Sequence, residues 1–283
     1  MKTAFLKTII YADIFDYPLT KEEINYWLIP SKSQNSSLIE EKEGFYFLKG
    51  RKKIINLRKL RNKYSKKKYE IATTIIETLK LIPTIKLIGI TGALSVDNSD
   101  KNDDIDLFII TQKNTLWTTR FLATLMLDIL RVRRKPYQNE IANKICLNMF
   151  VDENHLKIPP KEQDLYTAHE VLQMKPLWEK DNIYQKFLSQ NQWVKKYLPN
   201  AYKPKDTSDG KDTSEVSEGL LGWWRKQQSL LETLLKKLQL WYMKNRRTTE
   251  IINEGIIRFH PQDARIWIME KYRKKLKDLN LKA

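Results

Sequence analysis

Two aspartates separated by one residue, Asp104 and Asp106, are the side chains of this sequence best placed to do chemistry. They flank Ile105 at the start of an apolar run, and side chains two residues apart on a strand lie on the same face. Two carboxylates held side by side repel each other unless a cation lies between them, and an all-oxygen ligand set favours Mg²⁺ or Mn²⁺. The pair therefore predicts a divalent metal site at the mouth of a strand.

A pair of small residues, Gly92 and Ala93, ends the preceding apolar run, and ten residues separate Ala93 from Asp104. Residues without bulk let backbone N–H groups approach a phosphate closely. The residues that follow, including Ser95, are expected to begin a short helix whose N-terminus favours an anion. A metal beside a phosphate cradle is typical of phosphoryl or nucleotidyl transfer.

The elements that must position these residues form an α/β pattern. Three apolar, β-branched segments of strand length are expected to be strands, and one amphipathic segment between the last two is expected to be a helix. The strands are predicted at Ile85–Ile90, Ile105–Thr111 and Ile145–Val151, and the helix at Leu116–Val132.

The order hydrophobic-Gly-small, spacer, Asp-hydrophobic-Asp resembles the signature of the DNA polymerase β-like nucleotidyltransferase superfamily. Specifically, it looks like bacterial proteins that carry this domain behind a winged helix. The resemblance covers Lys86–Val151 and, more thinly, the segment YADIFDYPLTKEEI near the N-terminus. It implies a nucleotidyltransferase core with a small mixed sheet over residues 83–160. It also implies that Asp104 and Asp106 ligate the metals, and that Gly92, Ala93 and Ser95 hold the nucleoside triphosphate.

The sequence departs from this family at two positions. Ala93 stands where serine is common, and Ser95 is the nearby hydroxyl. On the strand that usually carries a third carboxylate, the central polar residue is Asn148, which alternation places on the same face as Cys146 and Phe150. Asn148 is therefore predicted as a weak third metal ligand, since an amide oxygen coordinates but cannot act as a base. The alternative is a buried amide bonded to backbone.

The first 55 residues are predicted to form a small winged helix-turn-helix. Lys2–Tyr11 has helical apolar spacing, and Thr20 with Glu23 forms a capping box that opens a second helix. A third helix is expected within Ser36–Glu43, followed by a two-stranded wing whose turn lies at Lys49-Gly50. The strongly basic helix over 56–82 is either a connector with a solvated face or a surface that tracks phosphates.

The rest of the chain is predicted to be helical. Helices over 161–198 complete the core, a polar segment over 199–218 is a flexible linker, and 219–283 is a C-terminal helical region. His169 and Glu170 lie on one of these helices, either facing the nucleotide or as ordinary core or surface residues. An apolar face around Trp223, Trp224 and Trp241 is expected to pack on the protein, with base stacking or membrane-surface docking as alternatives.

Composition limits the class of protein. The 283 residues carry 51 Lys and Arg against 34 Asp and Glu, a net charge of +17. This excess either attracts polyanions such as RNA or DNA or only keeps the helix faces solvated. One cysteine and three scattered histidines cannot build a disulfide within the chain or a zinc site, so a reducing cytoplasm fits best. The longest run without Asp, Glu, Lys or Arg is ten residues, so no membrane segment and no membrane partner are expected.

Two functions follow as hypotheses. The first is a metal-dependent nucleotidyltransferase that uses Mg²⁺ or Mn²⁺ to move a nucleoside monophosphate from an NTP to an acceptor, with release of pyrophosphate. The second is a catalytically degenerate regulator that senses nucleotides and binds RNA or DNA through its basic N-terminal region. Salt-dependent binding of duplex DNA without turnover would favour the second. A winged helix that serves only structure or dimerisation is a third alternative.

Overall fold

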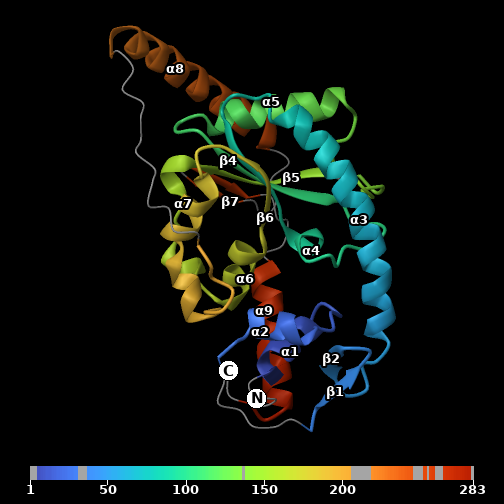
Figure 1. Cartoon of the computed structure of the whole chain (residues 1–283). Coiled ribbons are helices and arrows are strands. Elements are labelled where there is room, and N and C mark those ends of the chain that lie inside the picture. The colour runs from blue at the N-terminus through green and yellow to red at the C-terminus, as the bar shows by residue number, and fades with distance from the viewer. Residues whose placement is uncertain are drawn as a thin grey trace.

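A computed structural model describes residues 5–30, 37–135, 138–204, 218–244, 251–253, 255–258 and 264–281; for residues 218–228, 251 and 253 it describes the backbone only. The described part is a mixed α/β structure built around a six-stranded sheet (Figure 1). In their order across the sheet, the strands are β6 (Lys175–Glu179), β3 (Ile85–Ile90), β4 (Ile105–Thr111), β5 (Ile145–Asp152), β8 (Ile256–Arg258) and β7 (Ile251–Asn253). Strands β4 and β5 run parallel, and the other neighbouring strands run antiparallel.

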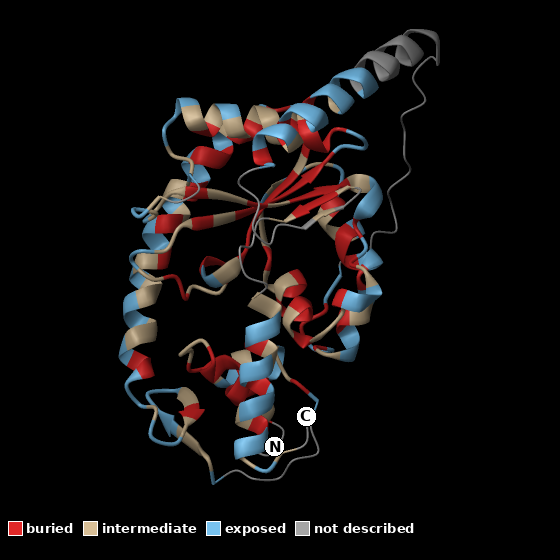
Figure 2. Cartoon of the chain, turned by 180° about the vertical axis from the view of Figure 1, so that it is seen from behind, coloured by how far each residue is buried: buried red, intermediate tan, exposed pale blue. Residues whose placement is uncertain are grey.

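Helices cover both faces of the sheet, as the buried residues in Figure 2 show. One face packs against α3 (Ile54–Leu79), α5 (Leu116–Ile129) and α8 (Glu218–Met243). The other packs in a core shared with α1 (Leu6–Asp13), α6 (Leu165–Gln173), α7 (Ile183–Gln190) and α9 (Ala264–Asp278). Strand β4 supplies Ile105, Leu107 and Ile109 to the first core and Phe108 and Ile110 to the second, and each such buried side chain contributes about 1.5–3 kcal/mol.

The predicted strands and helices of the centre are confirmed, and the sheet has members that the sequence pattern did not indicate. Strands β6, β7 and β8 lie in segments predicted to be helical or left unassigned. The C-terminal region is therefore not purely helical, because β8 pairs with β5 and extends the sheet. Most of the predicted linker, residues 205–217, lies outside the described residues.

The N-terminal unit contains α1, α2 (Lys21–Tyr26) and a hairpin of β1 (Ile39–Lys42) and β2 (Phe45–Leu48). The capping box is confirmed: the Glu23 N–H donates to Thr20 Oγ1 at 3.2 Å, and the Thr20 N–H donates to Glu23 Oε2 at 2.8 Å. The third helix predicted within Ser36–Glu43 is wrong, because β1 occupies that segment. The hairpin turns at Glu43 and Gly44, which both have positive φ as a two-residue hairpin turn requires, and not at Lys49-Gly50.

Three short 3₁₀ turns complete the described structure, at Glu153–His155, Pro160–Glu162 and Gln192–Lys196. Among the residues described, no helix combines the length and the apolar character needed to cross a membrane.

Candidate metal and nucleotide site

Strand β4 brings the two predicted metal ligands together. Asp104 immediately precedes the strand and Asp106 is its second residue. Because Ile105 and Leu107 point into the core under α3 and α5, both aspartates lie on the opposite face of the sheet. The alternation predicted from the sequence is therefore confirmed for this pair.

A third side chain completes the cluster, and it is Cys146. Strand β5 runs parallel to β4 with Cys146 directly opposite Asp106. One ligand atom from each of Asp104, Asp106 and Cys146 lies within 4.8 Å of the other two. The described residues thus bring two carboxylates and one thiol together.

The charges of this cluster act on one another. Burial and the negative charge of Asp104 raise the pKa of Asp106 well above its usual range. Burial, together with the two aspartates, likewise raises the pKa of the Cys146 thiol. One cation offsets part of the repulsion, since Arg134 Nη1 donates to Asp104 Oδ2 at 2.7 Å.

Asn148 lies on the irregular part of β5, two residues after Cys146, and lines a cavity together with Thr91 and Glu170. Its role as a third metal ligand stays a prediction. A bulge interrupts the pairing of β4 with β5 between Asp106 and Phe108, so the alternation on β5 shifts by one residue. Phe150, which simple alternation places on the face of Cys146, packs into the opposite core. Asn148 is 5% exposed, its amide nitrogen lies 3.5 Å from Thr91 Oγ1, and its Oδ1 has no hydrogen-bond partner among the described residues.

The turn after β3 packs directly against Asp106. The Thr91 N–H donates to the Asp106 backbone oxygen at 3.1 Å. Gly92 has φ +65°, and a Cβ at this position would lie 2.9 Å from Asp106 Oδ2. The turn continues as the four-residue helix α4 (Gly92–Ser95), in which the Ser95 hydroxyl donates to the Gly92 carbonyl at 2.8 Å. The Ser95 hydroxyl therefore stabilises the turn in this structure, and its proton is not free for a phosphate.

A buried lysine fixes the loop between the turn and Asp104. Lys68 of α3 is 1% exposed, and its ammonium donates to the backbone oxygens of Lys101 and Asp103 and, at 3.0 Å, to Asn143 Oδ1. Burial lowers the pKa of Lys68. One lysine of the basic helix is thus a structural anchor, whereas its neighbours Lys66 and Lys67 are exposed.

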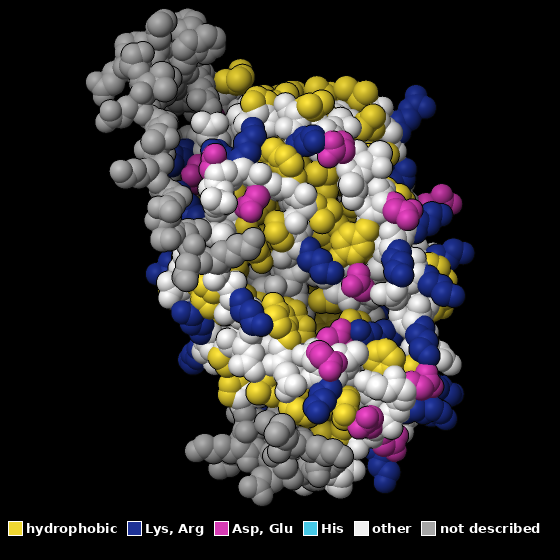
Figure 3. Space-filling model, in the orientation of Figure 1, with side chains coloured by type: hydrophobic (Ala, Val, Ile, Leu, Met, Phe, Trp, Pro, Cys, Tyr) yellow, Lys and Arg dark blue, Asp and Glu magenta, His cyan; other side chains and the backbone are white. Residues whose placement is uncertain are grey.

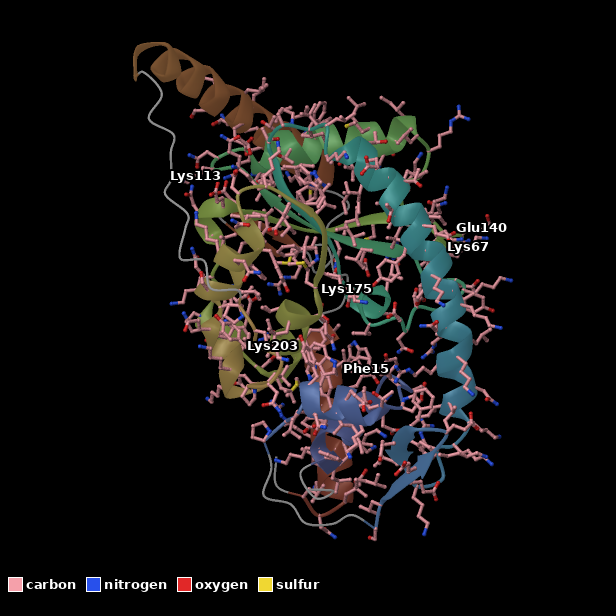
Figure 4. All side chains as sticks on the ribbon, in the orientation of Figure 1. Phe15, Lys67, Lys113, Glu140, Lys175 and Lys203 are labelled. Carbon is pink, nitrogen blue, oxygen red and sulfur yellow. The ribbon has the colours of Figure 1, made fainter. Side chains whose placement is uncertain are left out.

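A cavity of about 400 Å³ lies between the N-terminal unit and the sheet and includes Gly92, Ala93 and Ser95 in its wall. Figure 3 shows a hollow between these two parts, with hydrophobic side chains at its base. Phe15 and Lys175 lie on its two sides (Figure 4). Helix α6 supplies His169 and Glu170. Burial lowers the pKa of His169 to about 3 and raises that of Glu170 to about 7.

Three residues of this region, Cys146, Arg134 and Glu170, were not assigned to the metal site from the sequence. Cys146 and Arg134 lie 42 and 30 residues from Asp104 in sequence. The pairing of β4 with β5 brings Cys146 close, and the Arg134 N–H donates to the Ile145 carbonyl at the start of β5, which places its side chain beside Asp104. The sequence left Glu170 either facing the nucleotide or as a core or surface residue, and the structure places it in the lining of the same cavity as Gly92. A sequence signal for Cys146 did exist, because it is the second residue of its strand, as Asp106 is of β4.

Of the three side chains in the cluster, the two carboxylates suit a divalent cation and the thiol does not. Two carboxylates held side by side are the donors expected at such a site, while the protonated thiol is a weak third ligand for a hard cation. Comparison of the chain with protein-family models, with curated proteins and with solved structures gave no match.

Proposed function

We propose that this protein is a metal-dependent nucleotidyltransferase that moves a nucleoside monophosphate from an NTP to an acceptor and releases pyrophosphate. The observation that supports the proposal best is the contact of the Gly92 turn with Asp106, beside Asp104, at the edge of a 400 Å³ cavity. A small-residue turn packed on a pair of carboxylates is what the family signature in the sequence leads us to expect.

Each residue has a distinct task in this proposal. Asp104 and Asp106 would hold Mg²⁺ or Mn²⁺, which supplies positive charge to the triphosphate and to the departing pyrophosphate. Arg134 positions Asp104 through its 2.7 Å hydrogen bond. Gly92 lets the backbone lie against Asp106 without a side chain between them.

The reaction balances with one hydroxyl and one NTP. The acceptor oxygen bonds to the α-phosphorus, the bond from that phosphorus to the bridging oxygen breaks, and pyrophosphate leaves with the bonding electron pair. The acceptor's proton passes to a carboxylate of the cavity wall. Glu170 is the candidate, because burial raises its pKa to about 7 and its carboxylate can accept a proton near neutral pH.

The test measures transfer of α-phosphate label and release of pyrophosphate with each of the four NTPs, in Mg²⁺ and in Mn²⁺, with cell extract and bulk RNA as acceptors. We expect metal-dependent transfer by the wild type and none by the double variant Asp104→Asn/Asp106→Asn. The matched control is Asp181→Asn/Glu43→Gln, which removes two negative charges from exposed ion pairs elsewhere. Equal transfer by the aspartate variant and the wild type would contradict the two-carboxylate site.

A second candidate function rests on the surface of α3. Lys63, Lys66 and Lys67 are exposed along this helix, and the third member of the metal cluster is a thiol where catalysis would favour a carboxylate. Nucleotide binding without transfer, together with DNA or RNA binding that weakens steeply with salt and with Lys63, Lys66 and Lys67 changed to Gln, would favour a nucleic-acid-binding regulator.

A further inference from the structure

Aromatic rings supply much of the lining of the large cavity. Tyr11, Phe15 and Tyr17 come from α1 and the segment after it, Trp27 follows α2, and Trp267 comes from α9. Flat faces of this kind stack on planar heteroaromatic rings, at about 1–3 kcal/mol for each base stacked. The same cavity reaches Gly92 and Ser95, so a single ligand can contact the rings and lie close to the aspartate pair.

One polar group of the cavity has no partner. His169 is 4% exposed and stacks on Tyr11, with ring centroids 4.2 Å apart and planes 8° from parallel. Its Nδ1 lies 3.2 Å from the amide nitrogen of Gln173, which can only donate, so Nδ1 accepts and Nε2 carries the proton. Within the described residues, Nε2 is buried without an acceptor. A buried N–H without a partner costs about 1–3 kcal/mol, which a ligand that offers an acceptor atom would recover.

The charged groups of the cavity are largely paired already. Glu23 accepts two hydrogen bonds from Arg58 at 2.6 and 2.7 Å, and Asp97 lies 3.5 Å from Lys175 Nζ. Glu170 lies in the field of Arg258, which lowers its pKa against the larger effect of burial. The ring end of the cavity therefore favours an uncharged, planar ligand over a cationic or anionic one.

We propose that this cavity binds a nucleoside, with its base between the rings of Tyr11, Phe15, Tyr17 and Trp27 and a ring nitrogen or carbonyl oxygen of the base accepting a hydrogen bond from His169 Nε2. Only the orientation of the nucleoside rests on the proposed function: if the protein is a nucleotidyltransferase, the hydroxyl or phosphate end of the ligand faces the aspartate pair. Binding itself requires no metal and no turnover.

The base that occupies the cavity could belong to either of two molecules, the NTP itself or a nucleoside that serves as the acceptor. Competition separates them. A non-hydrolysable NTP analogue in Mg²⁺ that excludes the nucleoside identifies the cavity as the site of the NTP base. Simultaneous binding of the two identifies it as the acceptor site.

The experiment titrates the full chain with adenosine, guanosine, cytidine and uridine, each alone and without metal, by calorimetry. We expect at least one nucleoside to bind and its affinity to fall about tenfold or more in His169→Phe, which keeps the ring and removes the N–H, and in Trp27→Leu. The controls His155→Phe and Trp241→Leu lie outside the cavity and should change the affinity less than about twofold. Circular dichroism and melting temperature check that each variant is folded.

Binding of no nucleoside would overturn the inference, as would equal binding by the wild type and both cavity variants. The same titration on Asp104→Asn/Asp106→Asn separates this result from the proposed function. Nucleoside binding that survives there while transfer is lost supports both. Transfer by the wild type without any nucleoside binding overturns only the inference about the cavity.

Discussion

At the scale of single residues, Gly92 is the position of the site where no other residue fits. Its φ of +65° is costly for residues with a side chain, and a Cβ would lie 2.9 Å from Asp106 Oδ2. Gly92→Ala should therefore displace the Asp106 carboxylate and lower transfer at least about tenfold. The control is Gly50→Ala, because Gly50 has φ +81° but nothing within 4 Å of its Cβ position. Activity losses of the same size in both variants would show that backbone strain, and not the contact with Asp106, is responsible.

A substitution at Cys146 should strengthen the metal site, whereas Gly92→Ala should impair it. Cys146→Asp would place a third carboxylate opposite Asp106, so Mn²⁺ affinity should rise about tenfold, or 1.4 kcal/mol. The metal-free variant should melt at a lower temperature than the wild type, because three carboxylates then repel one another. Cys146→Asn serves as the uncharged control. Mn²⁺ titration and thermal melts in EDTA report the two effects, and unchanged Mn²⁺ affinity would mean that Cys146 does not face the ion.

At the scale of elements, the hydrogen bonds of Lys68, which tie α3 to the loop before β4, can be tested by substitution. Lys68→Met leaves the acceptors of Lys101, Asp103 and Asn143 without their donor, so we expect a loss of about 2–4 kcal/mol in the free energy of unfolding. Mn²⁺ affinity should fall as well, because the loop that leads into Asp104 loses its tie to α3. Lys67→Met, at an exposed neighbouring position (Figure 4), should change neither urea unfolding nor metal affinity. A Lys68→Met protein as stable as Lys67→Met would contradict the anchor.

The sequence predicts the central elements well because their hydrophobic pattern is local. The bounds of β3 and β4 agree with the predicted strands, and the capping box at Thr20 marks the start of α2. Strands β7 and β8 were missed because three residues carry too little pattern, and it is pairing with β5 that makes β8 a strand. The bulge on β5 shifts the alternation so that Phe150 packs on the face opposite Cys146, and it depends on pairing with β4, which lies far away in sequence.

At the scale of the whole molecule, two adjacent groups of α6 make stability depend on pH in opposite ways. Burial lowers the pKa of His169 from 6.5 to about 3, so the unfolded chain binds more protons and stability is lost as pH falls below 6.5. Burial raises the pKa of Glu170 from 4.5 to about 7, so its contribution is full below 4.5 and is lost as pH rises toward 7. Each effect amounts to about 1.4 kcal/mol per pH unit, and between pH 4.5 and 6.5 they oppose each other.

Single variants should separate the two effects. Relative to the wild type, His169→Gln should gain stability as pH falls below 6.5, and Glu170→Gln should gain stability as pH rises from 4.5 to 7. Urea unfolding in EDTA between pH 4 and 8 measures both differences. Differences that stay constant across this range would mean that neither group titrates differently in the folded and unfolded states.

The N-terminal helix and α9 are close neighbours although they are far apart in the chain. The Tyr272 hydroxyl donates to the Lys7 carbonyl at 3.4 Å across 265 residues, and Lys275 of α9 shares the buried Asp13 carboxylate with Arg51. During synthesis, therefore, α1 leaves the ribosome long before its partner exists, with Leu6, Ile10 and Tyr11 of its packing face uncovered. A ribosome that stalls before residue 264 therefore releases a chain in which α1 lacks the contacts it makes with α9, and the part of its apolar face that α9 covers is left exposed to solvent.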